Sequence, residues 1–119
     1  MWDVEGTDQF ASWYADLNEE EQIKIDVAVA WLEEHGPAGG RPFVETIRAS
    51  RHGRMKELRP RGGNLRVLFA FDPRRTAILL IGGDKTDRWE AWYDAMIPVA
   101  DDLYAAYFSF RSVRRRGGR

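Results

Sequence analysis

The 119-residue sequence predicts an α+β fold, in which a small antiparallel meander sheet is packed on one face by two N-terminal helices and a C-terminal helix. Three observations indicate this class. Apolar residues recur at helical spacing over the first 35 positions, three strand-like segments follow between residues 55 and 82, and a further helical pattern begins after residue 87. The turns between the strands have hairpin length, so antiparallel pairing is expected.

Two helices are expected near the N-terminus, after a short strand over residues 2–5. Thr7 or Asp8 can cap the first helix, whose aromatic residues repeat at the spacing of one helical face. Asn18 and Glu21 resemble a capping box at the start of the second helix, with asparagine in place of serine or threonine. The sequence HGP, which follows its apolar stripe, is the expected end of this helix.

The strand segments are MKELRP, NLRVLFAFD and TAILLIG, separated by the turns RGG and PRR. Alternation along the middle strand predicts two unlike faces. One face carries Leu65, Val67, Phe69 and Phe71, and the other carries Arg66, Leu68 and Ala70. We expect all three helices to cover the large apolar face and the face of Arg66 to stay partly open.

The last helix is expected to begin at Asp87 with Glu90 as its capping partner. Pro98 lies inside this pattern and predicts a kink or two abutting helices, because proline removes an amide donor and clashes with the preceding turn. Residues 1–110 are expected to form a single domain, and residues 111–119 a basic, disordered tail.

Charge is segregated along the chain although the net charge is only −1. Residues 1–40 carry ten acidic side chains and one basic, whereas residues 41–88 carry twelve basic and five acidic. Such a pattern is typical of a protein that binds a polyanion through its basic segment. The alternative is that the two segments pair with each other across the fold.

Composition limits the cellular context and the chemistry. The sequence has no cysteine, which excludes disulfides and thiolate metal sites and fits a cytoplasmic protein. No apolar run approaches the roughly 20 residues needed to span a membrane. The glycines of IGGDKT lack the spacing of a phosphate-binding Walker loop, no Gly-x-Ser-x-Gly motif is present, and the two histidines do not suggest a metal site. Neither a metal nor another cofactor is expected.

Basic residues at the strand ends form the candidate site. Arg66 lies on the face expected to be open, and regular pairing would bring Arg59, Arg61 and Lys85 close to it. Planar guanidinium groups suit phosphate oxygens, so a phosphodiester ligand is expected. The predicted RNA-binding residues are Arg51, Lys56, Arg61, Arg74 and Arg75.

RNA cleavage by the RNA's own 2′-hydroxyl is the reaction that these residues fit. It requires no metal and no protein nucleophile, only orientation, charge neutralisation and proton transfer. Arg59 and Arg66 would neutralise charge on the reacting phosphate. Proton transfer would fall to Lys85 with a lowered pKa, to His52, or to groups on the RNA's carrier, and His52 is otherwise an ordinary loop histidine.

Four stretches in order, MKELRP, LRVLFAFD, AILLIGGDKT and WYDAMIPVADDLYAAY, resemble the RelE/HigB group of type II toxin–antitoxin toxins within the RelE/ParE superfamily. The resemblance covers about residues 1–108. It implies a small α+β fold and, for most members, cleavage of mRNA on the ribosome. With the metal-free chemistry expected above, the chain would be a metal-independent endoribonuclease, an mRNA interferase. The resemblance also implies a cognate helix-turn-helix antitoxin that forms a hetero-oligomer with the toxin.

The family's two strand arginines match Arg59 and Arg66, and its basic residue after the third strand matches Lys85. Lys56 is a weaker match. Family members often carry a pair of lysines where this chain has GGDKT with one. Two other functions stay open: a ParE-like toxin that inhibits DNA gyrase by protein contact, and a non-catalytic RNA-binding accessory protein of phage type. The sheet arginines favour RNA.

Overall fold

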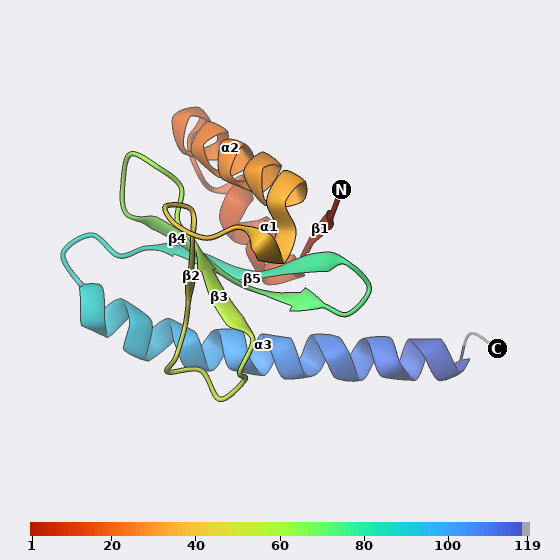
Figure 1. Ribbon diagram of the computed structural model, residues 1–119. Helices are drawn as coiled ribbons and strands as arrows, with labels where there is room; N and C mark the ends of the chain where they lie inside the picture. Colours follow the sequence, from red (N-terminus) through yellow and green to blue (C-terminus); the bar gives the residue numbers. More distant parts are fainter. Residues whose placement is uncertain (118–119) are drawn as a thin grey trace.

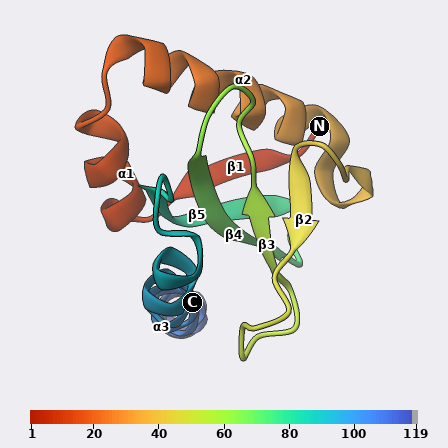
Figure 2. The same cartoon turned by 90° about the vertical axis from the view of Figure 1, so that its left-hand side faces the viewer.

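The computed structural model describes residues 1–117, and the side chains of residues 1–108. A five-stranded sheet lies between a layer of two helices and one long helix (Figures 1 and 2). In chain order the elements are β1 (Asp3–Gly6), α1 (Asp8–Ala15), α2 (Glu19–His35), a 3₁₀ turn (Gly36–Ala38), β2 (Val44–Thr46), β3 (Met55–Leu58), β4 (Leu65–Asp72), β5 (Thr76–Asp84) and α3 (Trp89–Gly117).

The strand order across the sheet is β1-β5-β4-β3-β2. β1 is parallel to β5, and every other neighbouring pair is antiparallel. The predicted meander is β3, β4 and β5, and the short strand predicted near the N-terminus is β1. The α+β class is confirmed. β2 was not predicted, because its three residues are too few to show a strand period.

Local capping interactions define both N-terminal helices as the sequence predicts. The Thr7 hydroxyl accepts a hydrogen bond from the Phe10 amide at 3.0 Å and donates to the Leu80 carbonyl at 2.6 Å, which ties α1 to β5. Asn18 and Glu21 form the reciprocal capping box of α2, with distances of 2.8 and 3.0 Å. These contacts satisfy amides that have no partner within the helix.

Alternation along β4 divides the apolar core between the two faces of the sheet. Val67 and Phe69 pack on the face covered by α1 and α2. Leu68 packs on the opposite face, against Trp92 and the other apolar residues of α3. The two sets of β4 side chains therefore separate as the sequence predicts.

The position of α3 corrects one expectation. It covers the face that carries Arg66, opposite to α1 and α2, instead of joining them (Figure 2). β4 is buried at all eight positions, and β5 has buried residues on both of its faces. Each face therefore requires its own helical layer. As a consequence, Arg66 is only 6% exposed and does not lie on an open surface.

Helix α3 is continuous through Pro98, whose side chain is exposed, so two abutting helices do not form. Among the described helices, none has both the length and the apolar run that crossing a bilayer requires. Residues 118–119 and the side chains of residues 109–119 lie outside the described part. The domain limits at 1–110 and the disordered basic tail at 111–119 stay predictions.

Two consecutive glycines of β5 allow an aromatic side chain to approach the sheet on each face. A Cβ atom at Gly82 would overlap the Trp13 ring of α1, and a Cβ atom at Gly83 would overlap the Trp92 indole of α3. The close packing of both helical layers therefore depends on the absence of side chains at these positions.

Gly82→Ala and Gly83→Ala are each expected to lower the free energy of unfolding by about 1–3 kcal/mol, because the indole rings must move out of the space that the methyl group takes. Urea titration of the purified variants measures this effect. Gly53→Ala is the control, since a Cβ atom there meets nothing within 4 Å. Equal midpoints for all three variants would contradict the close approach.

Candidate nucleic-acid site

Three charged side chains are buried on the α3 face of the sheet, close to the first turns of α3. Glu57 comes from β3, Arg66 from β4 and Lys85 from the segment after β5, and they are 3%, 6% and 1% exposed. Glu57 lies opposite Leu68, and Arg66 is two residues before Leu68, so both side chains project to the same face. The structure thus brings Arg66 and Lys85 together and adds an acid that the sequence analysis missed.

Glu57 is the shared acidic partner of two arginines. Its Oε1 atom lies 3.5 Å from Nε of Arg59 and 4.0 Å from Nε of Arg66. Nη1 of Arg66 donates to the carbonyls of Leu65 and Gly63 at 2.7 and 3.3 Å. Within the described residues, Oε2 of Glu57 and Nε of Arg66 have no hydrogen-bond partner. Because buried polar atoms are usually paired, these two atoms mark a polar centre that a ligand or water can complete.

Lys85 is enclosed by aromatic rings from α3. Its Nζ atom lies 3.3 Å from the centroid of the Trp89 ring and 5.5 Å from that of Tyr93. Such contacts stabilise the cation. Burial nevertheless has the largest effect on the pKa of the Lys85 ammonium and lowers it from its ordinary 10.5. The charge of Arg66 also lowers this pKa, whereas the charge of Glu57 raises it. A lowered pKa makes proton exchange easier near neutral pH.

Tyr93 supplies a hydroxyl group to the same centre. Burial first, and then the neighbouring Glu57 carboxylate, raise the pKa of Tyr93 to about 12. Tyr93 therefore stays protonated at neutral pH and can donate a hydrogen bond to an anion.

Four arginines line an open hollow of about 400 Å³ beside the buried centre, namely Arg41, Arg59, Arg61 and Arg66. The Arg66 side chain is 8% exposed, whereas that of Arg59 is 33% exposed. Arg41 forms an ion pair with Glu45, in which Nε of Arg41 lies 2.9 Å from Oε2 of Glu45. We call this feature the arginine hollow. Several guanidinium groups around one cavity suit the phosphate groups of a nucleic acid.

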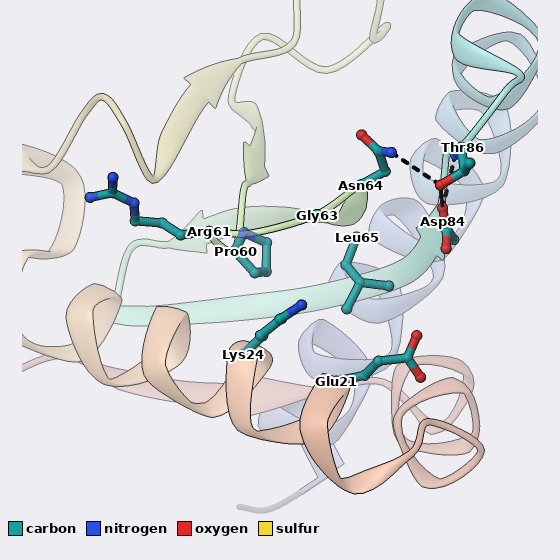
Figure 3. A pocket seen from close by; sticks show the side chains of 9 residues that line it. All are labelled: Glu21, Lys24, Pro60, Arg61, Gly63, Asn64, Leu65, Asp84 and Thr86. Carbon is teal, nitrogen blue, oxygen red and sulfur yellow. Dashed lines mark hydrogen bonds between the residues drawn. The ribbon is translucent and has the colours of Figure 1, made fainter.

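The loop over residues 59–64, which forms one wall of the arginine hollow, is anchored from two sides. Nζ of Lys24 in α2 donates a hydrogen bond to the Gly62 carbonyl at 2.9 Å. The side-chain amide of Asn64 donates one to the Thr86 hydroxyl at 3.1 Å. A polar pocket of about 230 Å³ lies between these anchors (Figure 3). The anchors hold the two loop arginines close to the start of β4.

His52 and Arg51 lie elsewhere, on a loop that is docked against the middle of α3. The His52 ring stacks on Tyr104 with centroids 4.2 Å apart, and Arg51 pairs with Asp102 at 2.8 Å. At a rise of 1.5 Å per residue, Tyr104 lies about 22 Å along the axis from the start of α3. The structure therefore does not bring His52 to the arginine hollow.

Three other predicted RNA contacts also lie outside the hollow. Lys56 projects to the face that carries α2, because it pairs with a residue of that core. Arg74 and Arg75 belong to the turn between β4 and β5, at the opposite end of β4. Arg74 pairs with Asp72 at 3.7 Å, and the Arg75 guanidinium lies 4.8 Å from the centroid of the Trp2 ring.

Four residues of the site were not predicted: the charged residues Glu57 and Arg41, and the α3 aromatic residues Trp89 and Tyr93. A signal for Glu57 was present, because it precedes Arg59 by two positions in a strand and therefore shares its face. Arg41 belongs to a segment without a period, and only the folded chain shows where it lies. Among the described residues, no group of three or more histidine, aspartate or glutamate side chains is arranged to hold a metal ion.

A family model described as phage-derived protein Gp49-like matches residues 12–105. The chain belongs to this family. The Gp49-like chain is 48% identical over 93 residues to HigB3 of Mycobacterium tuberculosis, whose name describes it as a candidate toxin; the match covers 78% of this chain and 82% of HigB3. The chain is also 44% identical over 105 residues to HigB2 of the same organism, whose name gives the same description. That match covers 86% of this chain but only 52% of HigB2.

Solved RelE toxins share the fold of the Gp49-like chain. Isolated RelE of E. coli superposes with a TM-score of 0.60 at 10% identity, covering 81% of this chain and 96% of RelE. RelE of Pyrococcus horikoshii, solved in complex with RelB, superposes with a TM-score of 0.58 at 16% identity. This match covers 72% of this chain and 97% of that RelE. At this identity the match concerns the fold. Together with the HigB relatives, it confirms the predicted resemblance to RelE/HigB toxins.

Lys85→Met is expected to change how stability depends on pH. The folded state lowers the pKa of the ammonium, so the charged lysine reduces stability at every pH below its folded-state pKa. This cost disappears as pH rises through the folded-state pKa toward the ordinary value of 10.5. The variant's gain in unfolding free energy over wild type should therefore be largest near pH 7 and smaller near pH 10. Urea titrations at both pH values test this, and a gain that grows with pH would contradict it.

Proposed function

We propose that this chain is the toxin of a type II toxin–antitoxin system and that it cleaves mRNA on the ribosome without a metal ion. The arginine hollow beside the buried centre of Glu57, Arg66 and Lys85 is the observation that carries the proposal. The HigB relatives support the toxin assignment. The hollow supports an RNA target, because it offers fixed positive charge where a phosphodiester can enter.

In the proposed reaction, the RNA 2′-oxygen attacks the adjacent phosphorus and the bond to the 5′-oxygen breaks. Arg59 and Arg66 bind the phosphate oxygens and stabilise the negative charge of the transition state. The carbonyls that hold Arg66 keep its guanidinium oriented before RNA arrives. A site organised in advance needs little rearrangement during the reaction, which is where electrostatic catalysis gains most.

Two neighbouring groups can move the protons that this reaction requires. Glu57, as a carboxylate, can accept the proton of the 2′-hydroxyl. Lys85, whose pKa is lowered by burial, can donate a proton to the leaving 5′-oxygen. Trp89 covers Lys85 and is itself 56% exposed, so it can reorient when RNA enters.

Two partners follow from the proposal. The ribosome presents the mRNA, which places the site of action in the cytoplasm. RelE of Pyrococcus horikoshii and RelE of Methanococcus jannaschii were each solved in complex with RelB. By extension, a cognate helix-turn-helix antitoxin would neutralise this chain in a toxin–antitoxin hetero-oligomer.

Arg59→Ala is expected to slow single-turnover cleavage of mRNA on programmed ribosomes by about 100-fold, because a charge that stabilises the transition state is lost. Arg74→Ala is a matched control. Each arginine pairs with a carboxylate two residues earlier, but Arg74 lies at the far end of β4. The control rate should stay within about threefold of wild type.

Equal losses in both variants would argue against the arginine hollow as the RNA site. Mapping of mRNA 5′ ends after induction of the wild-type chain tests the activity itself. New ends in phase with codons are expected. Growth arrest without such ends would point to another target, such as DNA gyrase.

His52→Gln is expected to leave the cleavage rate within about threefold of wild type, since the ring packs on Tyr104 far from the arginine hollow. The same single-turnover assay measures it, with circular dichroism as the check on folding. A loss of cleavage rate between about tenfold and a thousandfold in a folded variant would instead show that His52 acts as a general acid or base, because such catalysis contributes on that order.

A further inference from the structure

The loop between β2 and β3, residues 47–54, carries three arginines and no acidic residue. The three are Arg48, Arg51 and Arg54, and all of them are exposed. In Figures 1 and 2 the loop extends beyond the sheet on the side of α3. We call residues 47–54 the basic loop. The proposed reaction makes no use of its charge.

A buried carboxylate of α3 fixes the backbone of the basic loop. Asp101 is 4% exposed, and its two carboxylate oxygens accept hydrogen bonds from the Ser50 hydroxyl and the Arg51 amide. The Ser50 oxygen in turn accepts a hydrogen bond from the His52 amide at 2.9 Å. Hydrogen bonds to an ionised carboxylate are stronger than those between neutral groups. Asp101 therefore holds three consecutive residues of the loop in place.

This anchoring is more than a hairpin connection requires. Such connections usually have about two to five residues, whereas the basic loop is longer. Burial of a carboxylate is unfavourable unless the group is hydrogen-bonded, and Asp101 does not line the arginine hollow. A loop that is ordered before its ligand arrives loses less conformational freedom on binding. Length and anchoring together are typical of a loop that binds a partner.

The anchored backbone presents positive charge that the fold leaves unneutralised. Among the described residues, Arg48 and Arg54 form no ion pair. Arg51 pairs with Asp102, but the two side chains are 53% and 75% exposed. An exposed ion pair contributes little to stability, so Arg51 can exchange this carboxylate for another anion. The loop thus offers guanidinium groups, whose planar geometry suits phosphate oxygens.

We propose that the basic loop binds the phosphate backbone of RNA, as a second contact that is separate from the arginine hollow. Arg48 and Arg54 bind phosphate oxygens, and Arg51 can join them. Contacts of this type position a protein on a nucleic acid without reading the base sequence. The choice of RNA as the partner rests on the proposed function, in which the backbone is that of the mRNA or of ribosomal RNA.

The arrangement along α3 lets one extended polyanion reach both sites. Asp102, beside the basic loop, lies about 20 Å along the axis from the start of α3 at Trp89, which contacts Lys85. An RNA strand is charged along its whole length and can contact both sites, whereas a short acidic protein segment covers one. A substitution in the basic loop leaves the arginine hollow unchanged, so binding and chemistry can be measured separately.

The test compares Arg48→Gln/Arg54→Gln with the control Lys56→Gln/Arg75→Gln. Both double variants remove two positive charges, but the control residues lie toward the α2 face, where Arg75 packs on Trp2. Filter binding measures affinity for ribosomes without mRNA and for a single strand with the mRNA sequence. The loop variant should bind at least one probe about tenfold more weakly, and its salt dependence on logarithmic axes should be shallower by about 1.4 to 1.8, as for two lost phosphate contacts. The control should stay within about twofold of wild type.

Two further measurements separate a phosphate contact from a change in fold. Arg48→Lys/Arg54→Lys keeps the charge and should bind both probes within about threefold of wild type. Single-turnover cleavage by the Gln variant at saturating concentration should also stay within about threefold, because the loop does not touch the reacting phosphate. Weaker binding to ribosomes without mRNA would identify ribosomal RNA as the source of the backbone, and weaker binding to the single strand alone would identify the mRNA.

Wild-type affinity of the loop variant for both probes, or equal losses in the loop and control variants, would overturn the basic loop as an RNA contact and leave the proposed reaction standing. Growth arrest that is lost while both RNA affinities are unchanged would indicate a protein partner and would equally overturn it. A wild-type chain that cleaves no mRNA on programmed ribosomes would instead overturn the proposed function, and with it the reason for choosing RNA.

Discussion

The apolar character of both faces of β4 and β5 determines how the rest of the chain is arranged. Every residue of β4 is buried, and β5 has buried side chains on alternate faces. A strand that is buried on both sides needs cover on both sides, so the helices α1 and α2 cannot suffice. Helix α3 supplies the second layer (Figure 1). Its first turns then lie over the end of the sheet where Glu57, Arg66 and Lys85 come together, and so these three charged side chains are buried.

Burial of this much charge has an unfavourable free energy unless the charges are compensated. Glu57 compensates part of the positive charge, main-chain carbonyls bind one end of Arg66, and aromatic rings cover Lys85. The compensation is incomplete, because Oε2 of Glu57 and Nε of Arg66 stay without partners among the described residues. A centre selected for stability alone would favour full pairing. Incomplete pairing beside an open arginine hollow is typical of a site that completes its interactions with a ligand.

Local rules were enough to predict several parts of the fold and the site. The caps at Thr7 and Asn18 depend on neighbours three residues away, and the two faces of β4 follow from a period of two. Arg59, Arg66 and Lys85 converge because antiparallel register brings neighbouring strand ends together. The run AILLI in β5 shows no alternation of polar and apolar residues, which was a signal that both faces are covered.

Other parts depend on contacts that no local pattern contains. His52 is positioned by α3 residues about fifty positions away in the chain, such as the Asp101 carbonyl at 3.2 Å from its ring nitrogen. Arg74 and Arg75 were grouped with Arg66 because all are basic. The eight residues of β4 separate the two strand ends by roughly 25 Å, so one small ligand cannot contact both.

Segregation of charge along the sequence persists in the folded molecule. Among the described side chains, the ion pairs of residues 1–40 and those of residues 41–88 stay within their own segment or reach α3, and none joins the two segments. The acidic segment forms β1, α1 and α2, whereas the arginine hollow is built from the basic segment. A net charge near zero therefore conceals two surfaces of opposite sign. Fields of this kind act beyond contact distance and raise the encounter rate with oppositely charged partners. Partners of opposite charge can thus approach the same small domain at different places.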